Sequence, residues 1–116
     1  MKELVAYITT GYEEKTFTFD LISALKEAGT DRLELGIPFS DPVADGPVIE
    51  KANLEALKRG FVLNDLIALS TQTSPIIPTY WMGYFNSFYC KGFDVFSQQA
   101  HKCGVSGFII PDLPYE

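Results

Sequence analysis

The chain has 116 residues, of which 47% are hydrophobic and 14% aromatic, a size and composition that fit one globular domain with a packed core. Its formal net charge is −6 and its nine Lys and Arg residues are scattered, which argues against a nucleic-acid or membrane-surface partner. The two cysteines lack metal-ligand spacing, and neither a signal-peptide pattern nor an apolar run near the ~20 residues of a membrane span is present, so we expect a cytoplasmic protein with reduced thiols and no metal.

Apolar spacing and terminal glycines divide the first half of the chain into alternating strands and helices. Short apolar runs that end at a glycine are typical of strands, and runs of helix formers that end at a glycine are typical of helices. The expected elements are a strand over 4–10, a helix over 16–28, a strand over 32–36 and a helix over 48–59.

The second half of the chain continues this alternation. The expected elements are a short helix over 63–70 that begins at Asn64 or Asp65, a strand over 75–82, a helix over 93–102 and a strand over 105–110. Pro78 weakens the third strand, because proline cannot donate a hydrogen bond to a neighbouring strand. Strands that alternate with helices favour a parallel sheet with right-handed crossovers and a ligand site at the carboxyl ends of the strands.

Two architectures are consistent with four such strands. One is a small open α/β sheet, and the other is the first half of an eight-stranded barrel, which typically needs roughly 250 residues. Periodicity does not separate the two, and the chain has no internal repeat or linker that would divide it.

Glu34 is an unusual residue for the apolar strand over 32–36. Alternation places Leu33 and Leu35 on one face and Glu34 on the other, where the interior of a barrel or the mouth of a site would lie. A buried carboxylate costs free energy unless it is paired, so the plain alternative is an ion pair with a lysine or arginine of a neighbouring strand.

Asp41 and Asp45 follow in the loop FSDPVADGP. Each is explained individually by turn chemistry, and Asp45 also suits the cap of the helix that follows. Together, Glu34 and Asp45 supply two carboxylates in different surroundings at one strand end, an arrangement that separates acid and base roles.

Aromatic residues gather after the third strand, from Tyr80 to Tyr89, and Tyr7 lies on the first strand. They either line a pocket for a flat apolar ligand or pack in the core. The chain lacks the sequence motifs of nucleotide-binding loops, zinc sites and serine hydrolases.

Read as a whole, LELGIPFSDPVADGPVIEKANLEALKRG closely resembles the signature of the tryptophan synthase alpha subunit family. AYITTGY resembles the family's first strand, PTYWMGYFN its third strand and loop, and VSGFIIPDLPYE its fourth strand and loop. The resemblance implies a (βα)8 barrel and a lyase of tryptophan biosynthesis. Such a lyase cleaves indole-3-glycerol phosphate to indole and glyceraldehyde 3-phosphate by a retro-aldol step.

The resemblance also implies roles for individual residues. Glu34 corresponds to the family's general acid/base and Asp45 to its partner acid. The residues that would line the indole pocket are Tyr7, Met82, Tyr84 and Ile109. Pro38 and Asp41 would contact a PLP-dependent beta subunit, in an alpha2beta2 tetramer, so no cofactor is expected in this chain.

The chain departs from the family in one respect: it lacks the second half of the barrel, which holds the phosphate site in the family. We therefore expect residues 1–116 to form a single partial (βα)8 barrel domain, with little activity in isolation and with self-association of the half-barrel through its open edges. Two alternatives stay open. One is another phosphate-handling barrel enzyme, and the other is a non-catalytic module that binds a beta subunit or a small aromatic ligand.

Overall fold

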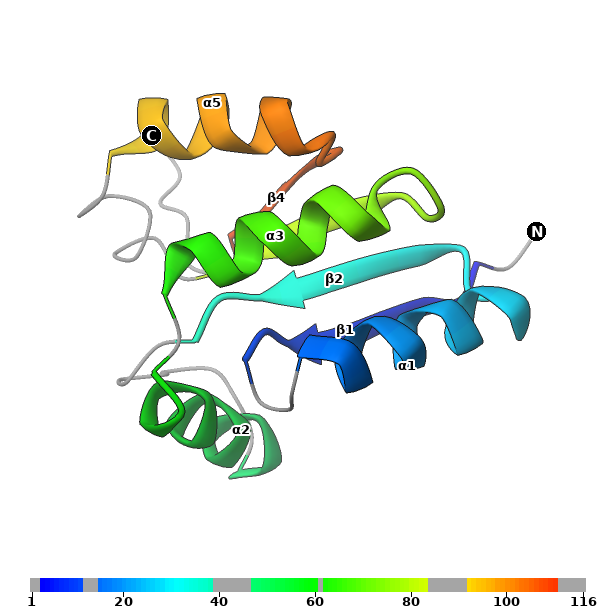
Figure 1. Ribbon diagram of the computed structural model, residues 1–116, viewed down its shortest axis with the longest axis horizontal. Coiled ribbons are helices and arrows are strands. Elements are labelled where there is room, and N and C mark those ends of the chain that lie inside the picture. Colours follow the sequence, from blue (N-terminus) through cyan, green and yellow to red (C-terminus); the bar gives the residue numbers. More distant parts are fainter. Residues whose placement is uncertain (1–2, 12–14, 39–46, 61, 84–91, 111–116) are drawn as a thin grey trace.

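A computed structural model describes residues 3–11, 15–38, 47–60, 62–83 and 92–110. Strands and helices alternate along these ranges as the sequence predicts (Figure 1). The elements are β1 (Val5–Thr9), α1 (Lys15–Glu27), β2 (Arg32–Gly36), α2 (Pro47–Lys58), α3 (Leu63–Thr73), β3 (Thr79–Met82), α5 (Phe93–Cys103) and β4 (Gly107–Ile109). No helix within these ranges is long and apolar enough to cross a membrane.

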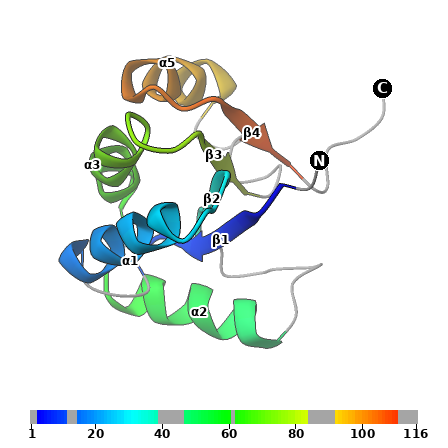
Figure 2. The ribbon, with the colours of Figure 1, turned by 90° about the vertical axis from the view of Figure 1, so that its right-hand side faces the viewer.

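The strands form one four-stranded sheet in the order β1-β2-β3-β4, with every neighbouring pair parallel. Helices α1, α3 and α5 all lie on one side of this sheet, as Figure 2 shows, and α2 lies beside β1. No described helix lies over the opposite face, which we call the inner face; the helix-covered side is the outer face. This parallel arrangement confirms the expected α/β architecture.

The hydrophobic core lies between the outer face and its helices. Leu33, Leu35 and Trp81 point to this side and are fully buried. The Trp81 ring contacts Phe96 of α5 edge-on at 6.1 Å and Phe108 of β4 at 5.9 Å, measured between ring centroids. Alternation therefore divides β2 as expected, because its leucines enter the core while Glu34 faces the other way.

A buried polar network joins the core to α3. The Trp81 indole N–H donates to the Ser70 hydroxyl at 2.7 Å, and that hydroxyl donates to the Leu66 carbonyl at 2.7 Å. The Thr73 and Thr79 hydroxyls lie 3.1 Å apart. Because each buried polar atom of this network has a partner, it carries little desolvation cost and ties α3 to β3.

One boundary of α3 differs from the predicted range 63–70. The helix begins at Leu63, as this range predicts, and the carboxylate of Asp65, one of the two residues predicted to start it, accepts the Val62 backbone N–H at 3.1 Å. It continues past Ser70 to Thr73, since the Ser70 hydroxyl bonds within the helix to the carbonyl four residues earlier.

The third and fourth strands are shorter than predicted. Strand β3 begins only at Thr79, because Pro78 cannot donate to the ladder, although its carbonyl accepts the Leu33 N–H at 2.9 Å. Strand β4 begins at Gly107, because Val105 still donates to the Ala100 carbonyl and thereby closes the end of α5.

Candidate functional site

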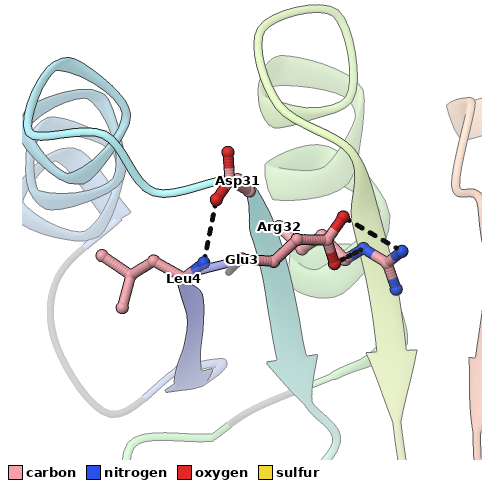
Figure 3. Close-up of polar contacts among 4 residues, drawn as sticks. All are labelled: Glu3, Leu4, Asp31 and Arg32. Atoms are coloured by element: carbon pink, nitrogen blue, oxygen red, sulfur yellow. Dashed lines mark hydrogen bonds and ion pairs between the residues drawn. The ribbon is translucent and has the colours of Figure 1, made fainter. Parts of the chain in front are cut away.

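Polar contacts at the amino ends of β1 and β2 set the register of these two strands (Figure 3). The Leu4 backbone N–H donates to Asp31 Oδ2 at 2.8 Å, and the Asp31 N–H donates to the Leu4 carbonyl at 2.8 Å. Beside them, Arg32 Nε lies 3.1 Å from a carboxylate oxygen of Glu3. These contacts fix which β1 residue lies next to Glu34, because a shift of the strand register by one residue would turn every side chain of β1 to the other face.

Two tyrosines lie beside Glu34 on the inner face. In the parallel register, Glu34 of β2 pairs with Tyr7 of β1 and with Tyr80 of β3. Paired residues of neighbouring strands point to the same face and lie roughly 5 Å apart. The carboxylate is therefore placed between two phenol side chains, and all three residues are half-buried.

The next level toward the carboxyl ends includes the apolar side chains of Met82 and Ile109. Thr9 pairs with Gly36, Gly36 with Met82, and Met82 with Ile109. The register therefore brings Tyr7, Met82 and Ile109 to the face that Glu34 occupies. These are three of the four residues predicted to line an indole pocket.

No ion pair among the described residues includes Glu34. Arg32, its nearest cationic neighbour on the same strand, is paired with Glu3 and also lies over the Tyr80 ring, with 5.6 Å from its guanidinium carbon to the ring centroid. The plain alternative of an ion pair between neighbouring strands is therefore not seen in this part of the chain. No cation among the described residues therefore neutralises the Glu34 carboxylate.

Three of the predicted site residues, Asp41, Asp45 and Tyr84, lie outside the described residues, so the pairing of Glu34 with Asp45 stays a prediction. Pro38 is described and is buried just after β2. Its contact with a partner also stays a prediction. Within the described ranges, no group of three His, Cys, Asp or Glu residues is placed to hold a metal ion.

The structure adds Tyr80, Gly36 and Gly107 to the site. Tyr80 belongs to the aromatic run noted in the sequence, and its spacing of two from Met82 is the signal that places both on one face. The two glycines lie inside strands, where glycine often marks a close approach by another group. A Cβ atom added at Gly107 would lie 3.4 Å from the Tyr80 ring, an ordinary van der Waals contact, so the ring packs over Gly107 without requiring a glycine there.

This arrangement suits proton transfer at a flat apolar ligand. Glu34 places a carboxylate on the inner face, tyrosines flank it, and Met82 and Ile109 lie beyond it toward the carboxyl ends, where ligands of parallel α/β sheets bind. A carboxylate in such surroundings can give or take a proton, and the aromatic and apolar groups can hold a ring.

Sequence comparison identifies the relatives of this chain. The family model described as tryptophan synthase alpha chain matches residues 1–116. The tryptophan synthase alpha chain of Wolinella succinogenes is 58% identical over 116 residues, and that of Dehalococcoides mccartyi is 45% identical over 115 residues. The alignments cover 100% and 97% of this chain but only 46% and 45% of these relatives, so the chain spans about half their length.

Solved structures give the same relationship in three dimensions. Tryptophan synthase subunit alpha from Legionella pneumophila superposes with a TM-score of 0.89 at 41% identity, over 97% of this chain and 44% of that one. A chain of the tryptophan synthase a2b2 complex from Pyrococcus furiosus superposes with a TM-score of 0.87 at 37% identity, over 97% of this chain and 48% of that one. Because these neighbours are (βα)8 barrels that extend to twice the length, the four-stranded unit is a partial barrel, as the resemblance implies.

Proposed function

The chain belongs to the tryptophan synthase alpha chain family, and from this premise we propose that it supplies the catalytic acid/base of a barrel that cleaves indole-3-glycerol phosphate. The products are indole and glyceraldehyde 3-phosphate. The observation that supports this proposal is the place of Glu34 on the inner face, between Tyr7 and Tyr80 and unpaired by any described cation.

The retro-aldol step needs proton transfers at two points. C3 of the indole must accept a proton, and the glycerol hydroxyl must lose one as the carbon–carbon bond breaks. Glu34 carries these protons, and Asp45 accepts a hydrogen bond from the indole N–H where positive charge develops. Tyr7, Met82, Tyr84 and Ile109 hold the ring, and three of these four share the face of Glu34.

These steps require only proton transfer and hydrogen bonds, so the proposal assigns no cofactor to this chain. In the family, PLP belongs to the beta subunit. The Pyrococcus furiosus relative forms an a2b2 complex, and we extend this to a beta subunit as the partner here, contacted through Pro38 and Asp41. Residues 1–116 act as one partial-barrel domain, and a cytoplasmic location stays a prediction.

The 116-residue chain is expected to self-associate when it is studied alone. Strands β1 and β4 are the edges of the described sheet, and the inner face carries half-buried Tyr7, Met82 and Ile109. Unpaired edges and exposed apolar groups favour association with another chain. Light scattering after size exclusion should give a mass above that of a single chain, and a monodisperse monomer at all concentrations would contradict this expectation.

The function is tested by restoring a complete barrel. We expect no measurable indole release from the chain alone, and release from indole-3-glycerol phosphate after mixing with the C-terminal half of a related alpha subunit, such as that of Wolinella succinogenes. This mixture is called the reconstituted barrel below. Indole is measured directly, and a binding measurement shows whether the halves associate. An associated, folded mixture that releases no indole would overturn the proposed function.

A further inference from the structure

The two edges of the described sheet are open and run in the same direction. β1 pairs only with β2 and β4 pairs only with β3, in a sheet whose strands are all parallel. The Leu4 carbonyl accepts the Arg32 N–H at 3.3 Å, and the Thr10 N–H donates to the Gly36 carbonyl at 3.0 Å. Since alternate residues of a parallel strand bond to the same neighbour, the backbone groups of Val5 point to the open side of β1. A further parallel strand can therefore add to β1.

Neither the inner face nor α2 blocks this edge. The Tyr7 ring crosses from β1 onto β2, where a Cβ atom added at Gly36 would overlap the Tyr7 hydroxyl. The ring therefore leans away from the open edge. Helix α2 lies beside β1, yet solved relatives that superpose over 97% of this chain continue as closed barrels, in which the first strand has a second neighbour. The position of α2 thus leaves room for a strand.

The helices of the outer face are open at the same two ends. Helices α1, α3 and α5 form a row in which α3 lies between the other two (Figure 2). Leu21 of α1 is 39% exposed and Val95 of α5 is 46% exposed, whereas α3 has no large exposed hydrophobic residue. In this row, exposed large apolar side chains therefore lie on the two outermost helices, beside the open strand edges. Such groups favour burial against another chain.

The number of strands decides which partner closes both edges. The (βα)8 relatives superpose on this four-stranded unit over 44% and 48% of their own length, so the sheet has the curvature of half a barrel. A two-fold axis along the barrel would place β4 of each copy beside β1 of the other, which repeats one junction twice. Eight strands result, and no edge stays unpaired.

We propose that two copies of this chain close one eight-stranded barrel, in which β1 and α1 of each copy lie beside β4 and α5 of the other. The two inner faces then enclose a single interior, to which each copy contributes Glu34 and Tyr80 from opposite walls. The number of copies and the pairing of their edges go beyond the self-association expected above, and neither depends on the proposed catalysis.

The number of copies is tested first. Light scattering after size exclusion of the chain alone should give the mass of two chains, with dissociation to single chains as the only change on dilution. Association through one edge at a time would instead add copies without limit, because each added chain presents a new edge. Masses that rise continuously with concentration, or a monomer at all concentrations, overturn the inference.

The place of the junction is tested with Leu21→Glu. This change should weaken the dimer about 100-fold, roughly tenfold for each junction, because each junction would bury an unpaired carboxylate. Ala68→Glu is the matched control, on an exposed position of the central helix α3, and should leave the dimer unchanged. Sedimentation equilibrium measures both dissociation constants, and circular dichroism shows that each variant is folded. Equal constants for the two variants overturn the proposed junction.

Cross-linking tests the same junction without weakening it. In a chain that carries Leu21→Cys and Val95→Cys, α3 separates the two new thiols, so a short bismaleimide should join them only between copies. We expect covalent dimers from this double variant and not from either single variant, which retains the same native cysteines. Equal cross-linking in the double and single variants overturns the proposed pairing of α1 with α5.

The C-terminal half of a related alpha subunit separates this inference from the proposed function. Because that half would occupy the same two edges, adding it should convert the homodimer into a complex with one chain of each kind. A complex that retains two copies of this chain overturns the pairing proposed here. A one-to-one complex that releases no indole supports the pairing and refutes the proposed function.

Discussion

Replacing Glu34 with glutamine is expected to lower indole release by the reconstituted barrel about 10²- to 10⁴-fold, the usual contribution of a positioned general acid/base. Glutamine has nearly the same shape as glutamate but can neither deliver nor accept the proton that the retro-aldol step moves. Since Glu34 is half-buried and takes part in no ion pair among the described residues, the change should leave the fold intact. The measurement is the initial rate of indole formation, with far-UV circular dichroism as the check on folding.

The matched control is Glu27→Gln. Glu27 is an exposed carboxylate at the end of α1, on the side of the sheet away from Glu34, so its loss changes the net charge by the same amount without touching the inner face. The control should retain full activity. If Glu34→Gln were as active as Glu27→Gln, the acid/base would have to be another group, and the non-catalytic alternative would gain weight.

Replacing Trp81 with alanine is expected to lower the free energy of unfolding by about 3–5 kcal/mol, the usual range for removing a buried large aromatic side chain. Trp81 is fully buried, its ring packs on Phe96 and Phe108, and its indole N–H donates to Ser70. Alanine leaves a cavity between β3 and α5 and removes the donor of the buried network. Urea unfolding followed by circular dichroism, at one fixed protein concentration because association affects apparent stability, measures the change.

Phe17→Ala is the control for this stability measurement. Phe17 is a large aromatic residue of α1 that is 54% exposed, so its removal should change the free energy of unfolding by less than about 1 kcal/mol. Trp81→Phe should fall between the two, because it keeps a ring in the core and loses the hydrogen bond to Ser70. Equal losses for Trp81→Ala and Phe17→Ala would mean that the core does not lie on the outer face.

Local chemistry predicted the order of the elements more accurately than their boundaries. Strand β2 begins and ends as predicted, since Leu33 and Leu35 alternate with polar residues and glycine ends the run. The predicted C-terminal limit of α3 was wrong because Ser70 looks like a helix end in sequence. Its hydroxyl instead donates to the Leu66 carbonyl within the helix and accepts the Trp81 indole N–H. Trp81 lies eleven residues from Ser70 on another element, so no local sequence pattern predicts this hydrogen bond.

The candidate site was also only partly predictable, because local patterns place Glu34 but do not specify its neighbours on other strands. Alternation alone turns Glu34 away from the core, and the resemblance of its surroundings to a known signature assigns it a role. The neighbours of Glu34 come from β1 and β3, 27 and 46 positions away by the register Tyr7↔Glu34↔Tyr80. No periodicity in the chain specifies that register.

The amino-acid sequence is therefore sufficient for the α/β class and the family, and it singles out Glu34 as the candidate acid/base, because these depend on short-range alternation and on a contiguous motif. The seating of Tyr7 on Gly36, the engagement of Arg32 by Glu3 and Tyr80, and the burial of Trp81 follow only from the folded chain. Each of these contacts joins different strands or helices, and their pairing depends on packing and register across the whole sheet.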